Sequence, residues 1–253
     1  MFLSLGRAAL GTGFTFLMTT LGAATVFLLR EERTRASQGP LLGFAAGIMT
    51  AASVWSLLLP AIERSSRSAL PGWLPAAVGV TLGVLFLAAV DLLLSRLHVF
   101  GSGGDDERQR TALLMAAVTV HNVPEGLAVG LAFALTAHGQ QPAAAAALAL
   151  GIGIQNFPEG AAISLPLREQ GASRMRAFLG GALSGAVEPL FGILVVLIAS
   201  AVEPLMPLLL SFAAGAMLYV VVEELIPQAK GLSGTVGFTV GFLIMMILDV
   251  ALG

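Results

Sequence analysis

Long apolar segments, separated by short polar or Pro/Gly-containing breaks, fill nearly the whole chain. A helix of about 20 mostly apolar residues is long enough to cross the hydrocarbon core of a bilayer. The breaks divide the chain into eight such segments, at roughly residues 5–29, 40–62, 72–94, 110–135, 142–167, 175–201, 205–226 and 231–253. We therefore predict an all-α, polytopic membrane protein in which residues 1–253 form a single domain of eight transmembrane helices.

The composition agrees with this pattern and narrows the classes of function. Hydrophobic residues make up 57% of the chain and charged residues only 11%, whereas about 25% of residues are charged in a soluble protein. There are no cysteines, which excludes disulfides and thiolate metal sites. A net charge of -2 gives no indication of nucleic acid as a partner. The one sizeable polar connection, residues 95–110, contains His98 and reads as a flexible cytoplasmic linker.

The basic residues fall mostly on one side of the predicted membrane. Of the 13 Lys and Arg residues, all but three follow the first, third, fifth or seventh helix: Arg30, Arg33, Arg35, Arg96, Arg108, Arg110, Arg168, Arg174, Arg176 and Lys230. Arg7, Arg64 and Arg67 lie on the other side. Cytoplasmic loops carry the excess of Lys and Arg. Together with the Ala/Gly/Leu-rich composition typical of bacteria, this predicts a multi-pass inner-membrane protein whose two termini are extracytoplasmic.

Pairs of glycines four residues apart predict where helices approach one another closely. Small residues at this spacing let helix backbones come together in the membrane. The pairs are Gly43 with Gly47, Gly126 with Gly130, and Gly181 with Gly185.

Polar residues interrupt the fourth and fifth helices near their middle. The first motif is His121-Asn122-Val123-Pro124-Glu125-Gly126, and the second is Gln155-Asn156-Phe157-Pro158-Glu159-Gly160. Residues four apart share one face of a helix, so His121 lies above Glu125 and Gln155 above Glu159. Glu188 lies at the same depth in the sixth helix. An acidic residue at the bilayer centre costs about 2.5–3.5 kcal/mol, and no Lys or Arg occurs at this depth.

The uncompensated acids must therefore hold protons or a bound cation. An imidazole with several carboxylate and amide oxygens is the ligand set of a first-row divalent metal. Pro124 and Pro158 each precede a motif glutamate. Because proline has no backbone N–H, Pro124 leaves the carbonyl of Val120 without its donor, and Pro158 does the same to the carbonyl of Ile154. We expect both helices to be kinked there and to offer backbone oxygens to a polar cavity. The two helices run in opposite directions, as the inverted repeats of transporters do.

These paired motifs resemble the metal motifs of the ZIP (Zrt/Irt-like) transporters, and most of all the bacterial GufA-like branch. The similarity extends to segments 47–60, 184–189, 223–227 and 249–253. It implies a carrier that moves divalent metal toward the cytoplasm, zinc above all, with iron, manganese and cadmium as further candidates. It also implies alternating access of the elevator type, in which helices 1, 4, 5 and 6 slide against helices 2, 3, 7 and 8.

The resemblance further implies a paired (binuclear) metal centre between the fourth and fifth helices. One metal would be held by Met49, His121, Glu125, Gln155 and Glu159, and the other by Asn122, Glu125, Asn156, Glu159 and Glu188. The metal would be the substrate, so no catalytic residue and no cofactor is expected. Asn156 stands where some relatives have Asp, which removes one negative charge from the second position.

Other polar residues near the helix ends are candidates for the transport pathway. Glu63 and Asp249 lie at the outer ends of their helices, where they would attract an entering cation. Glu223 and Glu224 lie toward the cytoplasmic end of the seventh helix, where they would assist release, and Ser56 is a candidate to face the pathway. Asp91 lies near the cytoplasmic end of the third helix. For both Asp91 and Glu63, ordinary solvation of a helix end is as good an explanation as a role in the pathway.

Two other classes of function stay open on the residues alone. A membrane-embedded zinc metalloenzyme usually needs two or three histidine ligands, but His98 and His138 lie outside the predicted spans. A divalent cation channel would use weak, repeated sites along a pore rather than one multidentate site, and an organic-solute carrier would need Arg or aromatic groups at the site. The expected partners are metal ions, the lipid bilayer and a second copy of the chain in a homodimer.

Overall fold

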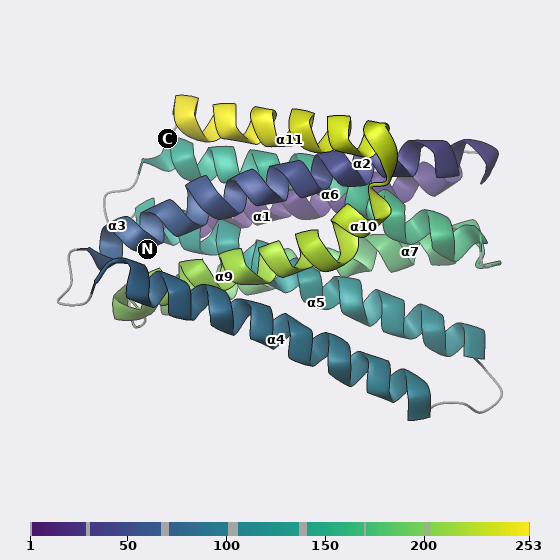
Figure 1. Ribbon diagram of the computed structural model, residues 1–253, viewed down its shortest axis with the longest axis horizontal. Coiled ribbons are helices and arrows are strands. Elements are labelled where there is room, and N and C mark those ends of the chain that lie inside the picture. Colours follow the sequence, from purple (N-terminus) through teal and green to yellow (C-terminus); the bar gives the residue numbers. More distant parts are fainter. Residues whose placement is uncertain are drawn as a thin grey trace.

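The computed structural model describes the backbone of residues 2–28, 31–66, 71–100, 106–136, 141–169, 171–199, 201 and 203–252. Side chains are described over the same ranges except at residues 2, 31–38, 94–95, 97–100, 106–118, 169 and 252. Every regular element in these ranges is a helix, and no strand occurs among them. The elements line up into eight helical rods that run side by side along the length of the molecule (Figure 1). The predicted all-α architecture with eight helices is therefore confirmed.

Some of the rods are single helices and others consist of several consecutive elements. The uninterrupted ones are α4 (Trp73–Phe100), α5 (Asp106–Leu135), α6 (Pro142–Glu169) and α11 (Gly231–Leu252). The first rod is α1 (Phe2–Ala23) with the short η1 (Ala24–Phe27), and the second is α2 (Glu31–Ala52), η2 (Ser53–Leu58) and α3 (Leu59–Ser65). The sixth is α7 (Arg174–Ser184) with α8 (Val187–Ile198), and the seventh is η4 (Glu203–Leu205), α9 (Met206–Val220), η5 (Val221–Leu225) and α10 (Ile226–Gln228).

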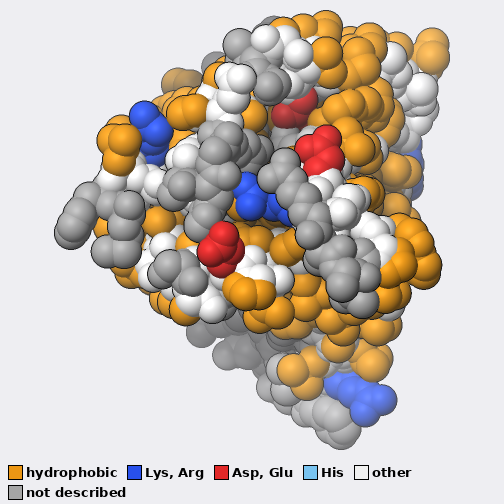
Figure 2. Space-filling view, turned by 90° about the vertical axis from the view of Figure 1, so that its left-hand side faces the viewer, with side chains coloured by type: hydrophobic (Ala, Val, Ile, Leu, Met, Phe, Trp, Pro, Cys, Tyr) orange, Lys and Arg blue, Asp and Glu red, His pale blue; other side chains and the backbone are white. Residues whose placement is uncertain are grey.

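Within the described residues, 6 of the rods are long and apolar enough to cross a membrane by length and composition. The two that fall short are α5 and α6, the helices whose apolar sequence is interrupted by the polar motifs. Hydrophobic side chains such as Leu85 on α4 and Ile247 on α11 point away from the bundle. Figure 2 shows the end of the bundle where both chain termini lie: acidic and basic side chains are visible on it, and hydrophobic ones cover the flanks.

The helices pack in two groups. In one group α1 packs against α6, and α5 packs against α8; α1 also touches α5, α7 and α8. In the other group α2 packs against α11, and α4 packs against α9. The groups meet where α6 contacts α2 and where α5 contacts α4 and α9. The polar motifs of α5 and α6 therefore lie inside the bundle, next to the boundary between the groups.

Glycines form several of these contacts, as their spacing predicts. A side chain on Gly43 or Gly47 would overlap a backbone carbonyl of α11, at Gly234 or Phe238. A Cβ on Gly126 would lie 2.5 Å from the carbonyl oxygen of Glu188. Side chains on Gly130, Gly181 and Gly185 would likewise meet α8, α6 or α1. The prediction of close helix contacts at the three glycine pairs is confirmed.

Irregular turns occur in three helices beside the motif helices. The second and seventh rods contain π-helical turns, η2 and η5, and the sixth is interrupted between Ser184 and Val187. Turns of the π type often mark functional sites. They carry Ser56, Glu223 and Glu224, and the interruption immediately precedes Glu188. In contrast, α5 and α6 continue through Pro124 and Pro158 without a break.

Candidate metal centre

Three carboxyl groups from three helices meet inside the first helix group. Glu125 on α5 and Glu188 on α8 are almost wholly buried, with 1% and 0% exposure, and Glu159 on α6 is partly buried. Each lies close enough to the other two for their negative charges to repel. No Lys or Arg side chain is among the buried residues that the structure describes. The site is therefore built for a cation or for protons.

Side-chain amides connect the carboxyl groups. Gln155 Nε2 donates to Oε1 of Glu125 at 2.6 Å and lies 3.3 Å from Oδ1 of Asn156. Asn156 Nδ2 donates in turn to Oε2 of Glu188 at 2.9 Å. Because the two amides are neighbours on α6, they bridge a glutamate of α5 to a glutamate of α8. The second polar motif therefore holds both carboxylates in fixed orientations.

Helix α1 supplies a further polar contact that the sequence did not reveal. The Thr19 hydroxyl donates to Oε1 of Glu188 at 3.3 Å, and the Thr15 carbonyl oxygen accepts from Asn156 Nδ2 at 3.4 Å. Both threonines are buried. Since Thr is common in membrane helices as a partner of its own backbone, the sequence gives little signal for this role. Each oxygen of Glu188 thus has a donor.

Several buried atoms of the motifs have no hydrogen-bond partner. They are both ring nitrogens of His121, both side-chain polar atoms of Asn122, Oε2 of Glu125 and Oε1 of Gln155. Leaving a buried acceptor unsatisfied costs about 1–3 kcal/mol, so such atoms are rare unless something else binds them. Carboxylate and amide oxygens are also ligands for divalent cations. The unpaired oxygens are therefore suited to hold a metal ion.

His121 faces acids of the second helix group. Its Nδ1 lies 2.9 Å from Oε1 of Glu224 in η5, and its Nε2 lies 3.8 Å from Oδ1 of Asp91 on α4. Both contacts are ion pairs when the imidazole is protonated. Ligand atoms of the three residues lie within 4.8 Å of one another, a spacing that one metal ion can bridge. Tyr219 completes the group, because its hydroxyl donates to Oδ2 of Asp91 at 2.7 Å.

From the sequence, Asp91 could be either a solvated residue at a helix end or a functional residue. Its approach to His121 now places it beside the site. Asp91 is the only charged residue in the apolar segment 72–94, a signal that would have supported a site residue. Tyr219 is the only tyrosine of the chain. Glu224 was expected on the release side, and the structure brings it to His121 itself. Met49 is buried on α2, a helix that packs against α6.

Two of the remaining pathway candidates contact each other. The Ser56 hydroxyl donates to Oδ1 of Asp249 at 2.5 Å and links η2 to α11, while Oδ2 of Asp249 is unpaired. Glu63 and Glu223 are exposed. The side chains of His98 and His138, predicted to lie outside the membrane, fall outside the described residues.

Comparisons with known proteins extend over the whole chain. A family model described as ZIP zinc transporter matches residues 104–249. The chain is 41% identical to zinc transporter GufA of Myxococcus xanthus, over 93% of this chain and 94% of the relative. It is 38% identical to human zinc transporter ZIP11, over 99% of this chain and 98% of the relative. It is also 38% identical to zinc transporter ZIPB of Bordetella bronchiseptica, over 98% and 82%. The family match includes both polar motifs.

Proposed function

The chain belongs to the ZIP family, whose named members are divalent-metal transporters and not enzymes, and we propose that it carries zinc across the inner membrane into the cytoplasm. The observation that carries this proposal is the cluster of the buried Glu125 and Glu188 with the partly buried Glu159, which has unpaired oxygens around it and no buried basic residue among those described. Iron, manganese and cadmium are proposed as further substrates, because the same ligands bind them.

We propose a paired site for the transported metal. His121, Glu125, Gln155, Glu159 and Met49 would hold the first ion, and Asn122, Asn156, Glu188 and the two motif glutamates the second. The unpaired atoms of Asn122, Glu125 and Gln155 support this assignment. The second position is the poorer one, since Glu188 already accepts hydrogen bonds from Thr19 and Asn156.

An elevator-like form of alternating access is the proposed mechanism. The division of the bundle into two helix groups supports it, because every proposed ligand except Met49 of α2 belongs to the group that contains α5, α6 and α8. His121 is a ligand in that group, and Asp91 and Glu224 belong to the other. As the first group slides toward the cytoplasm, we infer that Glu224 and Asp91 receive the metal from His121. Ser56, Glu63 and Asp249 would form the outer entrance, and Glu223 would lie at the exit.

The orientation of the carrier is also a proposal. Basic residues are in excess in the connections that follow the first, third, fifth and seventh helices. This excess supports a cytoplasmic location for those connections and an extracytoplasmic location for both termini. In this cysteine-free chain, an impermeant thiol reagent would label a single cysteine introduced at Ser66 in intact cells. It would label one introduced at Arg176 only after the membrane is opened. A homodimer, our further expectation, is tested by light scattering of the purified protein.

The central experiment is zinc uptake into proteoliposomes. We expect His121→Ala and Glu125→Ala to abolish uptake, and a surface control, Thr239→Ala on the exposed side of α11, to leave it unchanged. All three proteins must insert and elute as the parent does. Unchanged uptake in both site variants would show that the site is wrongly assigned. Competition by iron, manganese and cadmium ranks the substrates.

A second measurement separates a carrier from a channel. Zinc preloaded inside the vesicles should speed the entry of labelled zinc through a carrier, because the loaded site returns faster. A channel shows no such acceleration. Absence of counterflow with intact uptake would therefore favour the channel.

A further inference from the structure

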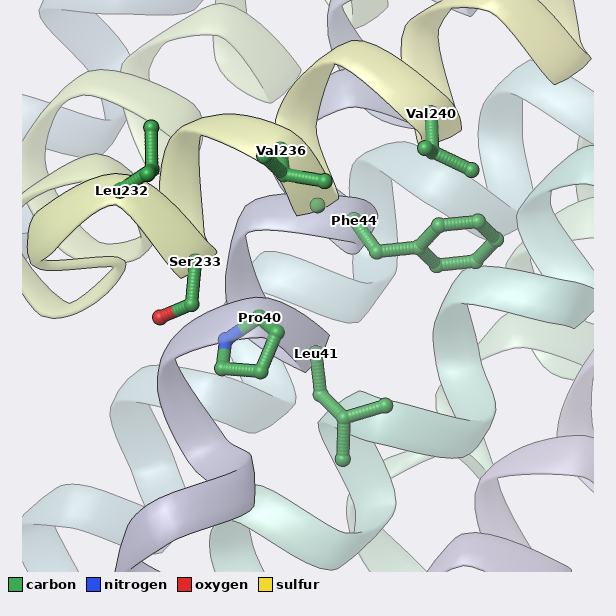
Figure 3. Close-up of a pocket in the computed structure, with 8 residues that line it drawn as sticks. Pro40, Leu41, Phe44, Leu232, Ser233, Val236 and Val240 are labelled. Carbon is green, nitrogen blue, oxygen red and sulfur yellow. The ribbon is translucent and has the colours of Figure 1, made fainter.

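A shallow groove runs between α2 and α11 on the outside of the bundle. It has a volume of about 840 Å³ and is lined by Pro40, Leu41, Phe44, Leu232, Ser233, Val236, Gly237 and Val240. Figure 3 shows Pro40 and Ser233 toward one end, and Phe44 and Val240 toward the other. The α11 wall is open to the surroundings, with Leu232 79% exposed and Val236 54%. The groove therefore faces the lipid.

The floor of the groove is backbone rather than side chain. A Cβ at Gly237 would overlap the carbonyl oxygen of Pro40, and one at Gly43 would overlap that of Gly234. The two helices thus touch along their glycines, and the larger side chains beside them form the walls. From Leu232 to Val240 the groove extends about 12 Å along the helix axis, which is most of the roughly 15 Å hydrocarbon depth of one leaflet.

Polar groups mark only one end of the groove. Lys230, the only lysine of the chain, immediately precedes α11, and its carbonyl oxygen lies 3.6 Å from where a Cβ of Gly39 would be. Gly39 is the neighbour of Pro40, so Lys230 lies at the end that Pro40 and Ser233 line. The Lys230 side chain is exposed and makes no ion pair with a described carboxylate, and the Ser233 hydroxyl has no hydrogen-bond partner among the described residues.

We propose that this groove binds an anionic phospholipid from the leaflet on the Lys230 side. One acyl chain lies along Val236 and Val240 against Phe44, and the phosphate is held by the Lys230 ammonium and the Ser233 hydroxyl. The beginning of α11 is at the membrane surface, where lipid headgroups are found. Basic residues at this depth on the cytoplasmic side attract anionic headgroups. The proposal does not depend on the transported metal.

The lipid fits the groove better than a second copy of the chain does. Two copies in a bilayer are related by a two-fold axis along the membrane normal, so the same ends of the two grooves would meet. Both Lys230 ammonium groups would then come together without a described acid nearby to pair with them. A lipid phosphate instead neutralises the charge.

Lipid retention by the purified protein tests the proposal. The protein is extracted from membranes, exposed to equal amounts of palmitoyl-oleoyl phosphatidylglycerol and phosphatidylcholine, and examined by native mass spectrometry. We expect retention of phosphatidylglycerol over phosphatidylcholine. Lys230→Gln should reduce the preference about fivefold, since one basic group near the surface contributes about 1 kcal/mol. Val236→Trp, which fills the groove, should abolish retention of the lipid.

The matched control is Arg176→Gln, which removes an exposed basic residue at the start of α7 and should leave the preference unchanged. Equal losses in Lys230→Gln and Arg176→Gln would overturn the proposal, because general surface charge would then explain the binding. So would unaltered lipid retention in Val236→Trp, whether or not that variant changes the oligomeric state. Each substituted residue is exposed on the surface of the bundle. Elution of the variant at the same volume as the parent protein verifies its folding.

Discussion

Nδ1 of His121 lies 2.9 Å from Oε1 of Glu224, which joins a motif residue of α5 to the π-helical turn η5 of the other helix group. Asp91 approaches the same ring from α4, with its Oδ1 3.8 Å from Nε2. A histidine of the proposed transport site thus lies next to acids that, in the proposed elevator-like mechanism, would stay in place while its own helix group moves. This contact makes Glu224 and Asp91 the proposed acceptors of the metal on its way out.

Glu224→Gln should strongly reduce zinc uptake. The substitution keeps the size of the side chain and removes the charge that faces His121. Loss of a charged partner of a metal-ligating histidine typically lowers metal affinity about tenfold or more. Initial uptake rates as a function of zinc concentration measure the effect. Glu203 is an exposed acid in η4 to which no role in transport is assigned, so Glu203→Gln is the control, and equal effects of the two substitutions would contradict the assignment.

Tyr219→Phe should weaken zinc binding without abolishing transport. The hydroxyl donates to Oδ2 of Asp91 at 2.7 Å and so keeps the other oxygen toward His121. A hydrogen bond of this kind contributes about 1 kcal/mol, which corresponds to about a fivefold rise in the apparent KM for zinc. The maximal rate should change little. Thr81→Val, which removes an exposed hydroxyl on α4, is the control, and an unchanged KM in Tyr219→Phe would remove Tyr219 from the site.

Gly126→Ala should destabilise the protein and impair transport together. The added methyl group would lie 2.5 Å from the carbonyl oxygen and 2.7 Å from Cα of Glu188, so α8 must move away and take Glu188 with it. Overpacking of this kind costs about 1–3 kcal/mol. Thermal unfolding in detergent and zinc uptake measure the two effects. The control is Gly13→Ala on α1, where the added methyl group would meet no atom of another helix within 4 Å. This variant should behave as the parent protein, and similar losses in both variants would contradict the packing argument.

The sequence predicted the parts of this fold that depend on length and spacing. The number of helices follows from apolar segments of membrane-spanning length, and the glycine contacts follow from pairs such as Gly126 and Gly130. The common face of His121 and Glu125 follows from helical periodicity. These features are local, because each is decided within one helix or by the size of one residue.

Features that depend on how helices are rotated against one another could not be predicted. Asp91 and Glu224 lie toward helix ends in the sequence, and only the packing of α4, α5 and α9 turns them toward His121. The interruption before Glu188 was also not predicted, since Ser184, Gly185 and Ala186 are ordinary residues of a membrane helix. Thr19 was not predicted as a site residue either, because threonine is also an ordinary residue of a membrane helix. Hydropathy gives the depth of a residue but not the direction in which its side chain points.

Asn156→Asp should strengthen metal binding at the second position and lower the stability of the metal-free protein. Asn156 Nδ2 now donates to Oε2 of Glu188 at 2.9 Å, and an aspartate cannot donate there. It would instead bring another negative charge against Glu188, which costs stability when no cation is present but adds a ligand when one is. We expect a lower unfolding temperature without zinc, a larger rise on adding zinc, and more zinc bound per chain by elemental analysis. Asn156→Ala, which removes the donor and adds no charge, should lose stability without gaining zinc. Equal zinc content and affinity in the parent protein and Asn156→Asp would show that Asn156 does not lie at a second metal position.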